Sequence, residues 1–207
     1  MIAVIGASGR TGRLVAHQAA ARGHPVTAVV RNATRFDPSA AARVAVAEST
    51  DAAQLAPVIA GCDAVLFCIG PVPGESTVIQ QDSIAAALEA MGPTGVRRIV
   101  AISASGGVVD GDDPLSRYVA KPILARVLRD SNADTAAMEE RLRESDAAWT
   151  ILRPPRLTDK PATGRYRQRR DGNVRWHYLM RRSHLAQAML DALHDDSSIH
   201  QTIAVTD

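Results

Sequence analysis

The feature that most constrains the fold is a glycine-rich turn near the N-terminus. An apolar run, Met1 to Ile5, leads into Gly6-Ala7-Ser8-Gly9-Arg10-Thr11-Gly12, and a helical pattern begins at about Arg10. Gly6 permits a tight exit from a strand, Gly9 lets the backbone approach a pyrophosphate, and Gly12 lets the helix pack close to the sheet. The N–H groups at a helix N-terminus also favour an anion. This strand–turn–helix setting predicts a dinucleotide site, and a purely structural glycine turn is the alternative.

Apolar runs alternate with helical patterns along the chain, an order typical of βα units and a parallel sheet. One domain of this length buries roughly 70% of the surface that its unfolded chain exposes. We therefore predict a Rossmann-like α/β fold, a doubly wound parallel sheet in a single domain over residues 1–207, with a small C-terminal subregion on the substrate side. Strands are predicted at 1–5, 25–31, 43–47, 64–69, 96–103, 149–153 and 201–205, and helices at 10–22, 51–61 (with Asp51 as a cap), from the 70–74 turn to 91, and at 183–194.

Two segments of the second half are less regular. Residues 115–144 are predicted to form one or two helices, with Ser131-Asn132 as the break if there are two. Residues 164–178 are predicted to form a hairpin around Asp171-Gly172-Asn173, since these residue types adopt the positive φ angles of tight turns.

Composition and spacing exclude several classes of protein. No apolar run approaches the roughly 18–20 residues that span a bilayer, and the apolar start lacks the length and basic flank of a signal peptide. Cys62 and Cys68 lie at the two ends of one predicted strand, which disfavours a disulfide and favours a reduced, cytoplasmic chain. The six histidines lack the spacing of a metal site, so we expect no metal.

The charge of the chain is small in total but uneven. Lys+Arg number 24 against 22 Asp+Glu, and Lys121 and Lys160 are the only lysines. Residues 153–182 hold ten basic and two acidic residues, a net charge of +8. This basic segment could be solvated surface, an electrostatic funnel for an anionic ligand, or a nucleic-acid contact, which the aromatic content of 3% disfavours.

The residue that closes the second predicted strand bears on the choice of cofactor. NAD sites usually carry an acid there for the ribose 2′-hydroxyl, whereas an arginine accommodates the 2′-phosphate of NADP. This chain has Arg31, with Arg35 four residues later and Arg10 in the glycine turn, and no acid lies between Val26 and Phe36. The pattern favours NADP(H) over NAD, with solvated surface arginines as the alternative.

The motifs together resemble a known family. Residues 6–12 and Val30-Arg31-Asn32-Ala33-Thr34-Arg35 are similar to the atypical short-chain dehydrogenases/reductases of the NmrA-like NAD(P)-binding family, nearest to the NADPH-dependent flavin/biliverdin-IXβ reductases. The similarity continues in order through residues 63–70, 102–105, 151–157 and 163–166. Because it covers nearly the whole chain, it is specific for fold and cofactor and less so for substrate.

The resemblance implies roles for individual residues. It implies phosphate contacts from Ser8, Gly9, Arg10 and Thr11, 2′-phosphate contacts from Arg31 and Arg35, and an adenine environment from Glu48 and Ser49. It further implies that Cys68, Ile69 and Gly70 line the cofactor and that Ser103, Ala104 and Pro154 border the nicotinamide.

The chain departs from the family at the proton-transfer residues. Most short-chain dehydrogenases use Tyr-x-x-x-Lys, but Tyr118 and Lys121 are three residues apart and lie upstream of the usual position, which Thr135 approximately occupies. Residues three apart still share a helix face, so a proton relay and an ordinary surface pair both remain open. Arg156 stands where the flavin reductases have a substrate-side histidine, which suits an anionic acceptor.

These observations give one leading hypothesis and two alternatives. The leading one is an NADP(H)-dependent oxidoreductase that passes hydride to a flat, acidic acceptor such as a flavin or quinone, with Ser103 or Ser105 positioning a reactant and Arg156 stabilising negative charge. The alternatives are a non-catalytic, NADP-sensing NmrA-like regulator and a carbonyl reductase or sugar epimerase using Tyr118 and Lys121. We expect a monomer or weak dimer without membrane or nucleic-acid partners.

Overall fold

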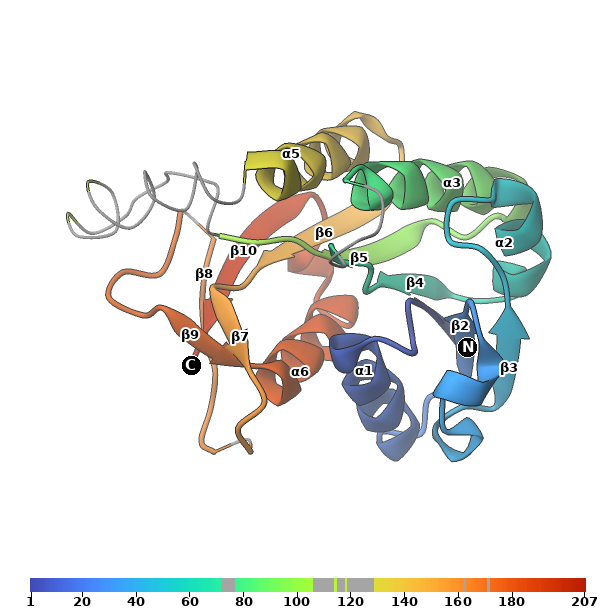
Figure 1. Ribbon diagram of the computed structural model, residues 1–207, viewed down its shortest axis with the longest axis horizontal. Coiled ribbons are helices and arrows are strands. Elements are labelled where there is room, and N and C mark those ends of the chain that lie inside the picture. Colours follow the sequence, from blue (N-terminus) through green and yellow to red (C-terminus); the bar gives the residue numbers. More distant parts are fainter. Residues whose placement is uncertain (72–76, 106–113, 115–117, 119–128, 162, 171) are drawn as a thin grey trace.

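The computed structural model of the protein describes residues 1–71, 77–105, 114, 118, 129–161, 163–170 and 172–207. Strands and helices alternate through most of the chain (Figure 1). The strands are β1 (Ile2–Ile5), β2 (Val26–Val30), β3 (Arg43–Val46), β4 (Ala64–Phe67), β5 (Arg98–Ile102), β6 (Ala148–Arg153), β7 (Arg156–Thr158), β8 (Arg167–Arg169), β9 (Leu179–Arg181) and β10 (Gln201–Thr206). The helices are α1 (Arg10–Ala21), α2 (Ala52–Ile59), α3 (Ile79–Thr94), α5 (Arg129–Glu144) and α6 (Arg182–Leu193).

The main sheet confirms the predicted doubly wound class. Its strand order is β3-β2-β1-β4-β5-β6-β10-β8, and all neighbours are parallel except the β10–β8 pair. The order reverses between β1 and β4, which run side by side in the sheet but are separated by two strands in sequence. A ligand crevice is expected at the carboxyl ends of the strands beside such a reversal.

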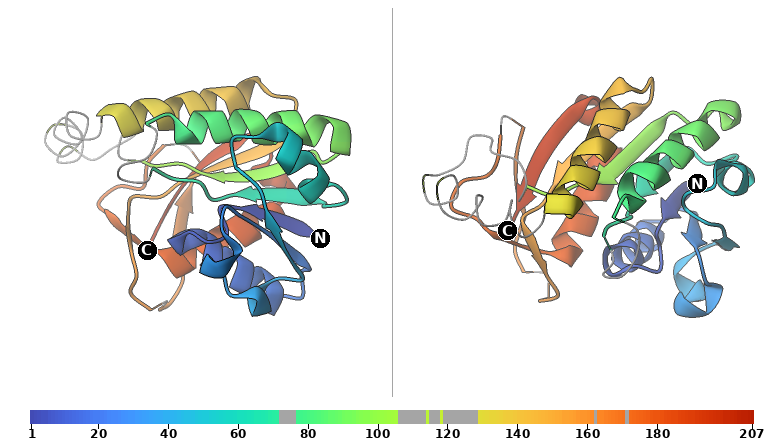
Figure 2. Two further views of the ribbon diagram at one scale, coloured as in Figure 1. Left: turned by 45° about the vertical axis from the view of Figure 1, so that its right-hand side comes forward. Right: turned by 45° about the horizontal axis from the view of Figure 1, so that its top comes forward.

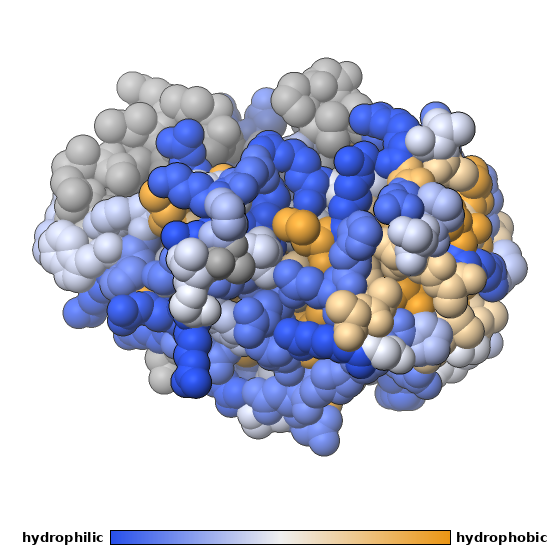
Figure 3. Space-filling view, turned by 90° about the horizontal axis from the view of Figure 1, so that it is seen from below, coloured by the Kyte–Doolittle hydropathy of each residue, from blue (hydrophilic) through white to orange (hydrophobic). Residues whose placement is uncertain are grey.

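Helices cover both faces of the sheet. α2, α3 and α5 lie on one face, and α1 and α6 lie together on the other (Figures 1 and 2). Two apolar clusters correspond to these layers, one containing Leu55, Ile84 and Met138 and the other Val15 and Leu190. Because both faces are covered, β1, β2 and β4 are buried at every position and apolar at every position except Thr27, as expected for central parallel strands. On the side of α1 and α6, strongly hydrophilic residues cover most of the surface (Figure 3).

Local signals explain where several elements begin and end. The Asp51 carboxylate accepts a hydrogen bond from the Gln54 N–H at 3.1 Å, which confirms the predicted cap of α2. Gly95, with a φ of 72°, ends α3 in the left-handed conformation, so this helix runs three residues beyond the predicted end at Met91. Cys62 and Cys68 are both free, as the strand between them predicts.

The break at Ser131-Asn132 that the two-helix alternative would require does not occur, because α5 runs through both residues. The polar side chains of this region make contacts that leave the helix intact. The Asp134 carboxylate accepts hydrogen bonds from the N–H groups of Gln80 and Gln81 at 2.9 and 2.8 Å and so caps α3. The Thr135 hydroxyl donates to the Ser131 carbonyl at 2.9 Å, within the helix. The part of the predicted helical region before residue 129 falls largely outside the described residues.

The predicted hairpin over residues 164–178 is also wrong. β8 pairs antiparallel with β10, where Arg169 lies opposite Ala204, instead of pairing with a strand after the turn. Gly172 does have the positive φ expected of a turn, 98°. β7 and β9 form a separate parallel pair, in which Arg156 lies opposite Leu179. The open edge of β10 is the better partner for β8, and this long-range pairing overrides the local turn signal.

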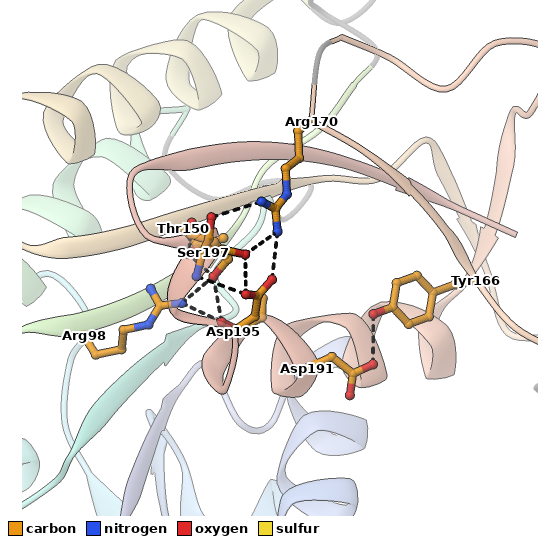
Figure 4. Close-up of polar contacts among 9 residues, drawn as sticks. Arg98, Thr150, Tyr166, Arg170, Asp191, Asp195 and Ser197 are labelled. Atoms are coloured by element: carbon orange, nitrogen blue, oxygen red, sulfur yellow. Dashed lines mark hydrogen bonds and ion pairs between the residues drawn. The ribbon is translucent and has the colours of Figure 1, made fainter.

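Ion pairs attach the basic segment to the C-terminal part of the chain. Arg170 contacts the Asp195 carboxylate and the Ser197 hydroxyl, both at 2.8 Å, and the Tyr166 hydroxyl donates to Asp191 at 2.9 Å (Figure 4). Burial and the Asp191 carboxylate raise the pKa of Tyr166, which keeps its phenol protonated. Part of the positive charge in residues 153–182 is therefore engaged in holding the fold.

Within the described residues, no helix is both long and apolar enough to cross a membrane.

Candidate functional site

A cavity of about 750 Å³ opens at the carboxyl edge of the sheet, where the strand order reverses. The glycine turn, the residues that follow β2 and β4, and the first residue of α6 form its walls. The lining residues among those described are Ile5, Gly6, Ser8, Gly9, Arg10, Thr11, Arg13, Val29, Val30, Arg31, Arg35, Ala47, Ser49, Cys68, Ile69, Gly70, Pro71, Ile79, Leu157 and Arg182.

The glycine turn adopts the conformation that the sequence predicts. Gly6 has a φ of +81°, a left-handed angle that a side chain would strain. A Cβ on Gly12 would lie 2.2 Å from the Gly6 carbonyl oxygen, so Gly12 packs beneath the turn and does not line the cavity. Gly9 caps α1 without a side-chain hydrogen bond, and no acidic residue occupies the first turn of this helix. The N-terminus of α1 is therefore suited to an anion.

Arginines dominate the polar part of the cavity. The predicted residues Arg10, Arg31 and Arg35 line it, together with Arg13 and Arg182, which the sequence analysis missed. No Asp or Glu is present among its described lining residues. Arg13 follows Arg10 by three residues on the same helix face, a signal that could have found it. No comparable local signal marks Arg182, which reaches the cavity through the packing of α6 beside α1.

Of the two residues expected near the adenine, Ser49 lines the cavity and Glu48 does not. Ser49 is buried, lines the cavity and shares a 2.8 Å hydrogen bond with the Ser83 hydroxyl. Glu48 is exposed and does not line the cavity, and its N–H donates to the Gln54 side chain at 3.1 Å. Adjacent residues at a strand end point to opposite sides, so only one of the two faces the site.

Cys68, Ile69 and Gly70 lie at the cavity wall as expected. Burial raises the pKa of the Cys68 thiol, and its sulfur lies 3.9 Å from the Met189 sulfur. A protonated thiol in apolar surroundings is a packing group and not a nucleophile.

A second, smaller cavity of about 200 Å³ lies beside the end of β5. Ala104 lines it together with residues of α5 and β6: Asn132, Thr135, Ala136, Glu139, Arg143 and Arg153. The Ser103 hydroxyl donates to the buried Glu139 carboxylate at 2.5 Å, and Arg153 donates to the same carboxylate through Nε at 2.8 Å and a terminal nitrogen at 2.5 Å.

The protonation state of the Glu139 carboxyl group follows from these contacts. Burial by itself would raise the pKa of Glu139, but hydrogen bonds from Arg153 and Ser103 outweigh it, so the pKa is lowered and the carboxylate is ionised near neutral pH. Glu139 stands four residues after Thr135, where the family pattern would place its lysine. This spacing is the signal that could have found it.

The hydrogen bonds of Thr135 connect the two cavities. Its hydroxyl oxygen lies 2.9 Å from the side-chain oxygen of the buried Gln80, so its single hydrogen is shared between that oxygen and the Ser131 carbonyl. The Gln80 amide in turn lies 3.5 Å from the carbonyl oxygen of Ile69, a residue of the larger cavity.

The residues predicted to be catalytic, and Pro154, which was expected to border the nicotinamide, are not among the described residues that line the two cavities. Ser103, Ser105 and Pro154 sit at the ends of β5 and β6, where the Ser105 N–H donates to the Pro154 carbonyl at 2.9 Å, but none of the three lines either cavity as the described residues define it. Arg156 is exposed and is absent from both linings, so the described structure does not bring it to the site. Tyr118 is 71% exposed, and Lys121 lies outside the described residues.

Known proteins of similar sequence and structure match along most of this chain. The uncharacterized protein YwnB of Bacillus subtilis is 26% identical over 176 residues, 84% of this chain and 81% of YwnB. A short-chain dehydrogenase/reductase from Veillonella parvula, solved in complex with NADP, superposes with a TM-score of 0.84 at 19% identity, covering 100% of this chain and 94% of the other. A candidate NADH-flavin reductase from Streptococcus pneumoniae gives 0.81 at 20% identity, covering 100% and 98%. These likenesses show the shared fold.

A protein-family model also matches the sequence of this chain over most of its length. Residues 6–196 match the family described as NAD(P)H-binding; this range includes the glycine turn, α6, the smaller cavity and all lining residues of the larger cavity except Ile5. The fold is also that of the short-chain dehydrogenases and related reductases, consistent with the NmrA-like resemblance in the sequence. The chain is therefore a member of the NAD(P)H-binding family, with the fold of an NAD(P)-dependent oxidoreductase.

Proposed function

We propose that this protein is an NADP(H)-dependent oxidoreductase that passes hydride from the nicotinamide to a flat acceptor, most simply a flavin. One observation carries the proposal: the cavity at the sheet reversal is lined by five arginines and, among its described lining residues, by no acid. The cavity volume of about 750 Å³ and the α1 N-terminus, which has no side-chain cap, support a dinucleotide as the ligand.

The position of two arginines supports NADP(H) over NAD(H). Arg31 directly follows β2, and Arg35 ends the short 3-10 turn Ala33–Arg35; both line the cavity. The end of β2 is where the 2′ position of the adenosine ribose is read in such folds. Forked guanidinium groups match a phosphate in geometry and charge, whereas a 2′-hydroxyl would call for a carboxylate.

The bound cofactor would supply the hydride, that is, two electrons and one proton. The acceptor gains the hydride and one proton, and the nicotinamide leaves oxidised. The chain contributes binding and orientation, which can account for a large part of a rate enhancement. Glu139 is ionised and accepts a hydrogen bond from the Ser103 hydroxyl. The Glu139 carboxyl group therefore carries no proton that it could donate to the acceptor. An acceptor that takes its proton from water, as a reduced flavin can, is consistent with this arrangement.

The test measures NADPH and NADH oxidation with FMN, riboflavin and small quinones. We expect turnover with a planar acceptor and a preference for NADPH. Arg31→Gln should raise the KM for NADPH about tenfold or more and change the KM for NADH little, because a charged hydrogen bond contributes about 1.5–3 kcal/mol. Arg97→Gln is the matched control, since Arg97 is exposed and precedes β5 at the opposite edge of the sheet. NADPH binding without turnover of any acceptor would refute the enzymatic part.

A second candidate is a non-catalytic, NADP-sensing regulator. It is favoured by the same Glu139, because an ionised carboxylate occupies the place where the family pattern has its catalytic lysine. This candidate predicts submicromolar to micromolar NADP binding with no acceptor turnover, so the acceptor panel distinguishes the two.

A further inference from the structure

The side chain of Asp159 makes ion pairs with two arginines of the cavity wall. One carboxylate oxygen contacts Arg10, and the other contacts Arg182 at 2.5 Å. Asp159 directly follows β7, whereas Arg10 and Arg182 come from distant parts of the sequence. Two guanidinium groups therefore converge on one anionic group at the edge of the cavity.

The local structure around this point favours an anion. Arg10 is the first residue of α1 and Arg182 the first residue of α6, so the positive ends of two helix dipoles accompany the two guanidinium groups. The Arg182 side chain is only 13% exposed, and burial lowers its pKa because its charge is poorly solvated. A poorly solvated cation gains from an anionic partner.

The Asp159 carboxylate can be displaced from the two arginines by a bound anion. Its side chain is 57% exposed, and that of Arg10 is 69% exposed, so the contact between them is a surface ion pair of small net strength. A carboxylate that stayed in place would also face any phosphate bound at the glycine turn and repel it.

We propose that Arg10 and Arg182 form a diphosphate subsite, separate from the 2′-phosphate arginines, and that Asp159 occupies it in the absence of ligand and is displaced when a dinucleotide binds. The inference rests on the proposed dinucleotide-binding function. It assigns Arg182 a direct ligand contact and makes Asp159 an internal competitor that weakens binding. Since NADH and NADPH share the diphosphate, the competition should affect both equally.

The first experiment compares Asp159→Asn with the wild-type protein. Dissociation constants are measured by calorimetry for NADPH, NADH, inorganic pyrophosphate and adenosine 2′-monophosphate. Losing the competing ion pairs should tighten NADPH, NADH and pyrophosphate binding about threefold to tenfold, given the strength of exposed salt bridges. Adenosine 2′-monophosphate, which lacks a diphosphate, should bind as before. Glu89→Gln, which removes one negative charge from an exposed position on α3, is the control and should change nothing.

Arg182→Gln provides the second variant. It should weaken both dinucleotides and pyrophosphate about tenfold and should abolish the gain caused by Asp159→Asn in the double variant. Thermal melting verifies that the variant is folded, and adenosine 2′-monophosphate should bind to it as to the wild type. Unchanged or weaker dinucleotide binding by Asp159→Asn would overturn the inference, as would an equal loss of adenosine 2′-monophosphate binding in Arg182→Gln. Pyrophosphate distinguishes a failure of the Asp159 inference from a failure of the proposed oxidoreductase function. Its tighter binding to Asp159→Asn depends neither on turnover nor on the preference for NADPH.

Discussion

Replacing Gly12 with alanine tests the central structural argument. The added Cβ would lie 2.2 Å from the Gly6 carbonyl oxygen and 2.9 Å from the Ala7 Cα, both backbone atoms that cannot rotate away. Ordinary contact begins at 3.4 Å, so α1 and the turn would have to separate by about 1 Å. Overpacking of this kind costs typically 1–3 kcal/mol and occasionally more. Because two backbone segments must move, we expect a cost of about 3 kcal/mol in the free energy of unfolding.

This cost has two measurable consequences. For a chain of this size it should lower Tm by about 6–12 °C. It should also weaken NADPH binding, because the N–H groups of the turn move with it. Gly92→Ala is the matched control: Gly92 lies in α3 with nothing within 4 Å of the added Cβ, so Tm should stay the same or rise slightly. A Gly12→Ala protein with the Tm and NADPH affinity of the wild type would refute the close-approach argument.

Further predictions concern three titratable groups, Glu139, His24 and Cys68. Glu139→Gln should cost about 3–5 kcal/mol, measured by urea unfolding, because it removes one partner of a buried ion pair with Arg153. In the wild type the lowered pKa of Glu139 should add stability above its unfolded pKa of about 4.5, and this gain should be lost as the pH falls through the folded pKa. Burial and the nearby His194 lower the pKa of His24, whose ring nitrogen lies 3.0 Å from that of His194, so Tm should fall as the pH drops below about 6.5, and less so in His24→Asn. Cys68 lines the cavity and is only partly buried, but its apolar surroundings raise the thiol pKa, so it should react slowly with a thiol reagent in the folded protein and faster in urea; fast labelling of Cys68 itself in the native chain would contradict the raised pKa.

Much of the fold and part of the site could be predicted from local signals. The alternation of apolar runs and helical patterns predicted the doubly wound sheet, and the three glycines predicted the geometry of the turn. Arg31 and Arg35 could be placed at the cavity because the residue after β2 has a fixed position in this topology. In each case the signal lies within a few residues of the structure that it specifies.

The residues that were misplaced depend on contacts that no local pattern encodes. Arg156 and Leu157 are neighbours in β7, and alternation along a strand sends them to opposite sides, so Leu157 lines the cavity while Arg156 faces solvent. Because Arg156 was assigned through the family resemblance, an offset of one residue between this chain and the family is enough to exchange these roles. Likewise β8 takes its partner from β10, more than thirty residues later, and Arg182 reaches the cavity only because α6 packs beside α1.

The short antiparallel strand β8 has a consequence for how this molecule behaves at high concentration. It is the last strand of the main sheet, and its three residues are Arg167, Gln168 and Arg169. The unpaired N–H and C=O groups of an edge strand can pair with the edge strand of another molecule, and short edge strands with charged side chains oppose this association. Without β8 the six-residue strand β10 would end the sheet, with Ile203, Ala204 and Val205 as its apolar centre. The chain thus ends its sheet on two arginines, whose mutual repulsion between molecules should protect crowded solutions from aggregation along this edge.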